Sequence, residues 1–207
     1  MATNDFKDVV ATYGITPDAV RLSLMQWAFQ HSGLPPYQWP KHEIYLGHES
    51  KDVEDRLVAI AKNPVKFVAE HKSLYLWSSL TGNGKTTWAI RILQSFIVAT
   101  AGYSAYEPIG YFVHVPTFLR HLQESYKDDA VADALQEPKG AMQNCQLVVF
   151  DDIASTRLTE NEQKYLLSFI DQRVLNGQSS IYTGNCGEAE LDAYVGKRLK
   201  SRVYNGA

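Results

Sequence analysis

Apolar side chains recur at helical spacing in the first third of the chain. They predict a helix over about residues 17–31, and a second helical stretch over about 51–71 that is interrupted near Asn63–Pro64. Between them, residues 34–50 are rich in proline and aromatic residues, which predicts an ordered connector lying on a core. The stripe of the first helix consists of Val20, Leu24, Trp27 and Ala28.

From residue 73 onward the pattern changes to short apolar runs that alternate with helical stretches. Four runs predict buried strands, at 73–77, 111–115, 146–150 and 179–183. Helices are predicted to about Ala101, from Pro116, from 160 to about 176 and from about 187 to 203. The helix from Pro116 carries Phe118, Leu119, Leu122 and Tyr126 on one side. This alternation predicts an α/β fold with a parallel sheet and helices on both faces.

The composition excludes disordered, collagen-like and coiled-coil proteins. The 207 residues are 45% hydrophobic and 21% charged, which is typical of a folded globular core. The formal net charge of −3 gives no general affinity for nucleic acid, so any such contact must be a local patch. No apolar run reaches the ~20 residues of a membrane span, and the amino terminus lacks the pattern of a signal peptide. We therefore expect a cytoplasmic protein without membrane contact.

Cys145 and Cys186 are the only cysteines, and no CxxC or HExxH motif accompanies them. They are expected to be buried small apolar residues in a reducing compartment.

The strongest chemical signal is SerLeuThrGlyAsnGlyLysThrThr, which follows a predicted strand and opens a helix. Gly82 and Gly84 let backbone N–H groups turn toward a phosphate, Lys85 adds a positive charge, and Thr86 offers a hydroxyl to Mg²⁺. The usual spacing has glycine where this chain has Ser79. The segment is still best interpreted as a phosphate-binding loop, formed by Ser79, Leu80, Thr81, Gly82, Asn83, Gly84, Lys85, Thr86 and Thr87.

A second motif, LeuValValPheAspAsp, ends a buried strand with two carboxylates. In P-loop NTPases this position holds the metal, so Asp151 is expected to contact Mg²⁺ through water, and Asp152 to orient or deprotonate the attacking water. One strand, 111–115, separates the two motifs along the chain. This order indicates the RecA/AAA+ division, in which an extra strand lies between the P-loop strand and the acidic strand.

The strand at 179–183 is followed by Gly184–Asn185, and its end is expected beside the acidic strand. Asn185 is a candidate for holding the water or the γ-phosphate, or it is simply a turn residue. The chain has no N-K-x-D motif, which favours ATP over GTP.

LysArgLeuLysSerArgVal lies on the last predicted helix, where Arg198 and Arg202 are neighbours on one face. Following an ATPase core, one of them, preferably Arg202, is a candidate arginine finger for the nucleotide of a neighbouring subunit.

These segments together resemble a known family. GlyAsnGlyLysThrThr, LeuValValPheAspAsp, TyrThrGlyAsn and GlyLysArgLeuLysSerArgVal occur in this order in the DnaC-type helicase loaders, which include DnaI and are related to the DnaA initiators and IstB transposition helpers, all AAA+ ATPases. Phe118–Leu119–Arg120 also resembles the segment after their second strand. The resemblance covers about residues 50–207, and the SerArgVal box narrows it to the loader and initiator branch.

The resemblance implies that ATP and Mg²⁺ are bound between subunits of a homo-oligomer. Lys85, Thr86, Asp151, Asp152 and Asn185 would act in cis, and Arg202 or Arg198 in trans. It also implies single-stranded DNA in a central channel, and a hexameric replicative DNA helicase as partner. The predicted function is an ATP-dependent helicase loader in DNA replication, with ATPase activity that is weak without an oligomer or partner.

Two domains are expected, a helix and connector at 1–49 and the AAA+ ATPase domain at 50–207. The extension is short, so the helix at 17–31 is the one compact candidate for helicase contact, and its stripe could equally pack on the ATPase core. An AAA+ core has a fifth strand, but only four are predicted here. Either residues 109–115 and 146–183 contain another, or the chain is truncated or degenerate, which would affect hydrolysis more than binding.

Two other functions share these motifs. One is an IstB-like transposase-assisting ATPase that acts on double-stranded DNA. The other is a non-hydrolysing ATP-dependent interaction module, for which Ser79 and the missing strand are the cues.

Candidate DNA contacts lie on and after the helix that follows the second predicted strand. Arg120, His121 and Lys127 lie where related proteins place channel elements, and Tyr126 could stack on a base. We favour the simpler interpretation, a charged solvent face with a core tyrosine. The adenine pocket is expected around Leu46.

Overall fold

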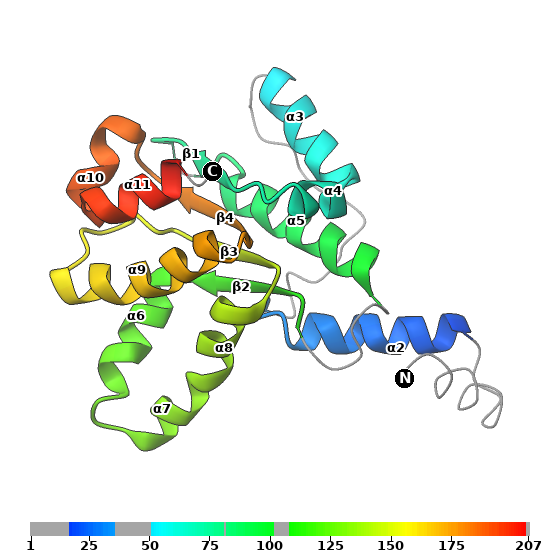
Figure 1. The fold of residues 1–207 in the computed structure, drawn as a ribbon, viewed down its shortest axis with the longest axis horizontal. Coiled ribbons are helices and arrows are strands. Elements are labelled where there is room, and N and C mark those ends of the chain that lie inside the picture. Colours follow the sequence, from blue (N-terminus) through cyan, green and yellow to red (C-terminus); the bar gives the residue numbers. More distant parts are fainter. Residues whose placement is uncertain (1–16, 36–50, 81, 102–107, 206–207) are drawn as a thin grey trace.

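The structure, a computed structural model, describes residues 17–35, 51–80, 82–101 and 108–205. Its centre is a four-stranded, fully parallel sheet in the order β1-β4-β3-β2 (Figure 1). The strands are β1 (Leu74–Trp77), β2 (Gly110–His114), β3 (Leu147–Asp151) and β4 (Ser179–Gly184). All four predicted strands are therefore confirmed to within a residue at each end. The prediction that each is buried is wrong for β1, which lies at a sheet edge, is only partly buried and leaves Trp77 50% exposed.

Helices connect the strands and cover both faces of the sheet, as the alternation in the sequence predicts. Before β1 lie α2 (Pro17–Gln30), α3 (Lys51–Lys62) and α4 (Pro64–Ala69), and after it α5 (Lys85–Thr100). Between β2 and β3 lie α6 (Val115–Glu124), α7 (Asp129–Ala134) and α8 (Gln136–Asn144). The remaining helices are α9 (Glu160–Leu175), α10 (Glu188–Val195) and α11 (Lys197–Asn205).

The side chains of β3 divide between the two faces of the sheet. Leu147 and Val149 belong to one buried cluster, with α5 and the helices before β1. Val148 and Phe150 belong to the other, with α6, α8, α9, α10 and α11. All four are fully buried, which explains why this strand reads as a continuous apolar run instead of an alternating one.

The sheet order confirms the expectation that an extra strand lies between the P-loop strand and the acidic strand. The strand that separates β1 from β3 in space is β4, whereas β2, the 111–115 run, lies at the sheet edge. Sequence order and spatial order differ because a parallel crossover can place the next strand on either side. Residues 109–115 and 146–183 contain only β2, β3 and β4, so they hide no further strand.

Two helix predictions need correction. The predicted helix 187–203 is two helices, which meet at Gly196. Gly196 has φ +80°, a backbone conformation that favours glycine, and a Cβ there would also require the end of the Gln163 side chain, 2.2 Å away, to move. The helix from Pro116 ends at Glu124, which leaves Tyr126 beyond the last turn and 78% exposed, so the core-tyrosine interpretation is wrong.

The first helix packs on the core only at its carboxyl end. Ala28 and Phe29 belong to the buried cluster around α5, whereas Leu22 is half exposed. After the helix, the carbonyl of Ser32 accepts a hydrogen bond from the N–H of Phe112, 2.7 Å away, so the chain lies along the open edge of β2. In Figure 1, α2 extends outward from this edge of the sheet.

In the described part of the chain, every helix is too short or too polar to cross a membrane.

Candidate nucleotide site

The carboxyl ends of the four strands meet at one edge of the sheet, together with the amino end of α5. This arrangement places the sequence-predicted residues from both motifs around one cleft of about 290 Å³. Open α/β sheets bind ligands at this edge, because the loops that follow parallel strands gather there. The cleft is lined by Gly82, Asn83, Lys85, Thr86, His114, Asp151, Asp152, Thr183 and Asn185.

The loop after β1 turns sharply into α5. Gly82 and Gly84 have φ +75° and +89°, in the region that favours glycine. The Lys85 ammonium donates to the carbonyls of Ser78 and Leu80 and to Oδ1 of Asn83, at 3.0–3.2 Å. The loop therefore holds a positive charge directly at the amino end of a long helix, which is an arrangement suited to phosphate.

Ser79, the departure from the usual pattern, causes no backbone strain. Among the described residues, the only non-glycine positions with positive φ are His71 and Asp152, so the backbone at Ser79 does not need glycine. Ser79, Leu80, Gly84 and Thr87 belong to the same loop and first helical turn, although they are not among the described residues that line the cleft. Thr81 lies outside the described residues, as does Leu46 of the expected adenine pocket.

Asp151 is held by two hydroxyl groups from different elements. The hydroxyls of Thr86 on α5 and Thr183 on β4 each donate to its Oδ1 at 2.7 Å. Asp151 is only 5% exposed, so these two bonds account for much of its polar environment. The two predicted metal residues, Thr86 and Asp151, are thus in direct contact, and Thr183 fixes the carboxylate from the opposite side.

Asp152 has an unusual backbone conformation, with φ +62°. Its N–H donates to the Thr183 hydroxyl at 2.8 Å, and its Oδ1 accepts from the Asn185 amide at 3.2 Å. Burial, and secondarily the neighbouring Asp151, raise the pKa of Asp152, while His114 and Lys85 act in the opposite direction. A carboxyl group with a raised pKa that faces a cleft is suited to accept a proton.

The sequence reasoning missed two residues of this site. Thr183 connects the two acids through one hydroxyl group, and His114 lines the cleft from the end of β2, where it is paired in register with Asp151. Both are the polar residues at or near the end of an apolar strand. That signal was present in the sequence, because the ends of parallel strands share one edge.

The two predicted arginines lie elsewhere. Neither Arg198 nor Arg202 is among the residues that line the cleft. Both are on α11, where Arg202 forms an ion pair with Asp171 of α9 and Arg198 is exposed. The structure therefore does not bring them to the phosphate loop of their own chain.

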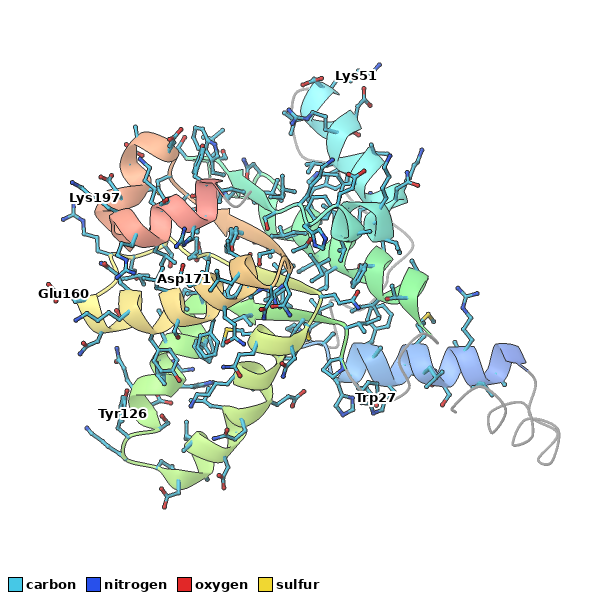
Figure 2. The ribbon with its side chains drawn as sticks, in the orientation of Figure 1. Trp27, Lys51, Tyr126, Glu160, Asp171 and Lys197 are labelled. Atoms are coloured by element: carbon cyan, nitrogen blue, oxygen red, sulfur yellow. The ribbon has the colours of Figure 1, made fainter. Side chains whose placement is uncertain are left out.

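The DNA candidates lie around the end of α6. Arg120 forms an ion pair with Glu124 at 2.8 Å and contacts His121 at 3.0 Å, while Lys127 is exposed. The Tyr126 side chain points away from the body of the molecule at the turn between α6 and α7 (Figure 2). The end of α6 and the residues after it therefore present Arg120, Lys127 and the exposed Tyr126 ring.

No family model and no curated protein matches this sequence. Comparison with solved structures does find similar folds. The DnaC helicase loader matches with a TM-score of 0.56 at 23% identity, over 76% of this chain and 89% of that one. DnaI matches with a TM-score of 0.63 at 19% identity, over 83% and 90%.

The replication initiator DnaA, solved with AMPPCP and single-stranded DNA, matches with a TM-score of 0.58 at 17% identity. That match covers 82% of this chain but 48% of the DnaA chain, so this protein spans about half of the initiator's length. At these identities the likeness concerns the fold. The chain therefore shares the parallel α/β fold of the DnaC helicase loader, DnaI and DnaA.

Proposed function

We propose that this protein is an ATP-dependent helicase loader, which binds a hexameric replicative DNA helicase and helps place it on single-stranded DNA during replication. One observation carries the proposal. Lys85, the Thr86–Asp151 pair and the Asp152–Asn185 pair converge on one cleft, in a chain that shares its fold with DnaC and DnaI over most of their length. ATP binding and hydrolysis would act as the switch.

The cleft suits ATP. Backbone N–H groups of residues 79–87 would surround the phosphates, and Lys85 would exchange its three loop acceptors for phosphate oxygens. The described residues contain no cluster of three or more His, Cys, Asp or Glu side chains that could enclose a metal. The neighbouring oxygen groups of Thr86 and Asp151 fit Mg²⁺, which takes few protein ligands and keeps phosphate and water oxygens. Bound there, Mg²⁺ would offset phosphate charge.

Hydrolysis would follow from the positions of Asp152 and Asn185. The Asp152 carboxylate would accept a proton from the attacking water, and the Asn185 amide, which donates to Asp152, would orient that carboxylate and the water or γ-phosphate. Arg202, with Arg198 as the alternative, would reach the γ-phosphate of a neighbouring subunit in a homo-oligomer. The ATPase activity would thus depend on assembly.

Separate parts of the chain would contact the partners. We assign residues 1–49 to helicase contact and residues 50–207 to the ATPase domain. Within the first part, the half-exposed Leu22 lies on the half of α2 that is not packed on the core. Single-stranded DNA would meet the end of α6 and the α6–α7 turn, where Arg120, His121 and Lys127 offer polar contacts and Tyr126 offers a ring for stacking. Cys145 and Cys186 are both buried and neither forms a disulfide, which fits the cytoplasm we propose as its location.

The test is a pull-down and size-exclusion experiment with the replicative helicase hexamer from the same biological source. Wild type, Lys85→Ala and the control Lys164→Ala, an exposed lysine on α9, are compared with and without ATP. We expect a stable complex whose ATP response is lost in Lys85→Ala and kept in Lys164→Ala.

Absence of a complex under every nucleotide condition would refute the loader assignment. Coating of long double-stranded DNA without a helicase would instead favour an IstB-like ATPase. An ATP-responsive complex without any turnover would favour a non-hydrolysing interaction module.

A further inference from the structure

Arg202 is anchored by an acidic residue on a different helix. Its Nε donates to Oδ1 of Asp171, which lies on α9 (Figure 2). The Asp171 side chain is 27% exposed and that of Arg202 is 47% exposed, so the pair lies at the surface with the arginine reaching farther into solvent. No other partner of Arg202 is found among the described residues.

The two helices that carry the pair are fixed by the core. Leu199 and Val203, on the inner side of α11, are buried at 1% and 0% exposure, in the same cluster as Leu166 and Ile170 of α9. Arg202 directly precedes one of these anchors, so its Cα is held in place by packing. What packing leaves undetermined is the direction of the long side chain, which loses rotamer entropy when it is held in one orientation.

The bond to Asp171 determines that direction without occupying the phosphate-binding end. A guanidinium group has five N–H donors, one on Nε and four on the two terminal nitrogens. Because Asp171 takes Nε, the four terminal N–H groups remain in the planar fork that binds phosphate oxygens in pairs. An arginine held only by packing would have to lose its rotamer freedom at the moment of binding instead.

We infer that Asp171 is a positioning residue for the arginine finger. It binds Nε of Arg202 and directs the terminal N–H groups toward the γ-phosphate held by a neighbouring copy of the chain. This inference rests on the proposed function, specifically on Arg202 acting in trans. Asp171 is not among the residues that line the cleft of its own chain, so its effect must pass through Arg202.

The test measures ATP turnover by the full chain at protein concentrations where the rate per subunit has become constant. Asp171→Asn keeps the shape of the side chain and removes its charge. We expect kcat to fall about ten-fold, with KM for ATP unchanged, because a misdirected finger affects the transition state more than ground-state binding. Asp171→Glu, which keeps the carboxylate, should recover much of the rate.

The matched control is Glu160→Gln, which removes one negative charge from the same helix where it faces Lys164 instead of Arg202. This variant should turn over ATP like wild type. Thermal unfolding of both variants checks that each is folded. If Asp171→Asn fails to fold, the comparison of Asp171→Glu with Asp171→Ala takes its place.

A subunit-mixing experiment separates positioning from a general structural role. Arg202→Ala subunits keep an intact phosphate loop, and Lys85→Ala subunits keep an intact finger, so mixing the two should restore turnover. When Lys85→Ala/Asp171→Asn subunits are mixed with Arg202→Ala subunits, the restored ATP turnover should be about ten-fold lower, although the Arg202→Ala subunits still contain Asp171. Within one chain, the Asp171→Asn/Arg202→Ala double variant should be no slower than Arg202→Ala alone.

The outcomes distinguish this inference from the proposed function. If Arg202→Ala turns over ATP like wild type, the finger assignment fails, and the inference fails with it. If Arg202→Ala is slow but Asp171→Asn is not, only the inference is overturned. Faster ATP turnover by Asp171→Asn than by wild type would mean that the aspartate restrains the arginine. Slower turnover by the double variant than by Arg202→Ala would indicate a role of Asp171 that is independent of Arg202. Either result also overturns the inference.

Discussion

Thr183 offers a direct test of how the two acids are held, because one hydroxyl group connects both. It donates to Oδ1 of Asp151 at 2.7 Å and accepts from the N–H of Asp152 at 2.8 Å, at a position that is 2% exposed. Thr183→Val replaces the hydroxyl group with a methyl group of similar size. The variant therefore leaves the packing almost unchanged and removes both hydrogen bonds.

The expected cost follows from these two bonds. A hydrogen bond to a charged group contributes about 1.5–3 kcal/mol, and a buried donor left without a partner costs about 1–3 kcal/mol. Allowing for some relaxation, we expect Thr183→Val to lower the free energy of unfolding by about 3 kcal/mol. ATP turnover should fall by more than about ten-fold, because both carboxylates lose their common anchor.

The assays are urea unfolding and steady-state ATP hydrolysis, with Thr183→Ser as the matched control. Serine keeps the hydroxyl group and loses one methyl group, which should cost about 1 kcal/mol of stability and leave turnover close to wild type. Turnover by Thr183→Val within two-fold of the serine variant would refute the reasoning, because the acids would then not depend on this hydroxyl group.

Three further predictions concern other positions. Arg173 is fully buried and donates hydrogen bonds to the Ser180 hydroxyl and to the carbonyls of Met142 and Cys145. Burial lowers the pKa of its guanidinium group to about 10. Because charged hydrogen bonds each contribute about 1.5–3 kcal/mol and together outweigh the cost of burying the charge, Arg173→Met should lose about 3 kcal/mol of stability in urea unfolding. The raised pKa of Asp152 means that its carboxyl group stays protonated to higher pH in the folded state than in the unfolded state. ATP turnover should therefore begin to fall with decreasing pH already above the ordinary aspartate range. The ionised form of Asp152, which is present at neutral pH, should lower the stability of the fold. Asp152→Asn should abolish turnover, and in unfolding curves its stability gain at neutral pH should shrink as pH falls. Gly33→Ala should be destabilised by more than about 1 kcal/mol in thermal unfolding, because φ is +70° and the new Cβ would lie 2.3 Å from the Phe112 carbonyl oxygen at the edge of the sheet.

The sequence by itself determined the elements of this protein and the chemistry of its phosphate loop. Buried parallel strands must be apolar on both faces, so the run ending at Phe150 was visible without a structure. The helix predicted from residue 160 was correct for a local reason as well, since α9 begins with a capping box between Thr159 and Glu162 whose bonds join residues three apart. Local pattern also placed Lys85 and Thr86 at the opening of a helix.

Only the tertiary structure decided what depends on residues far apart in the chain. It placed β4 between β1 and β3 and directed the Thr183 hydroxyl toward Asp151, a contact across 32 residues. It also left Tyr126 exposed where helical spacing predicted burial, because α6 ends before that residue. The pairing of Asp171 with Arg202 depends on how α11 packs on α9, and no spacing in the sequence specifies that packing.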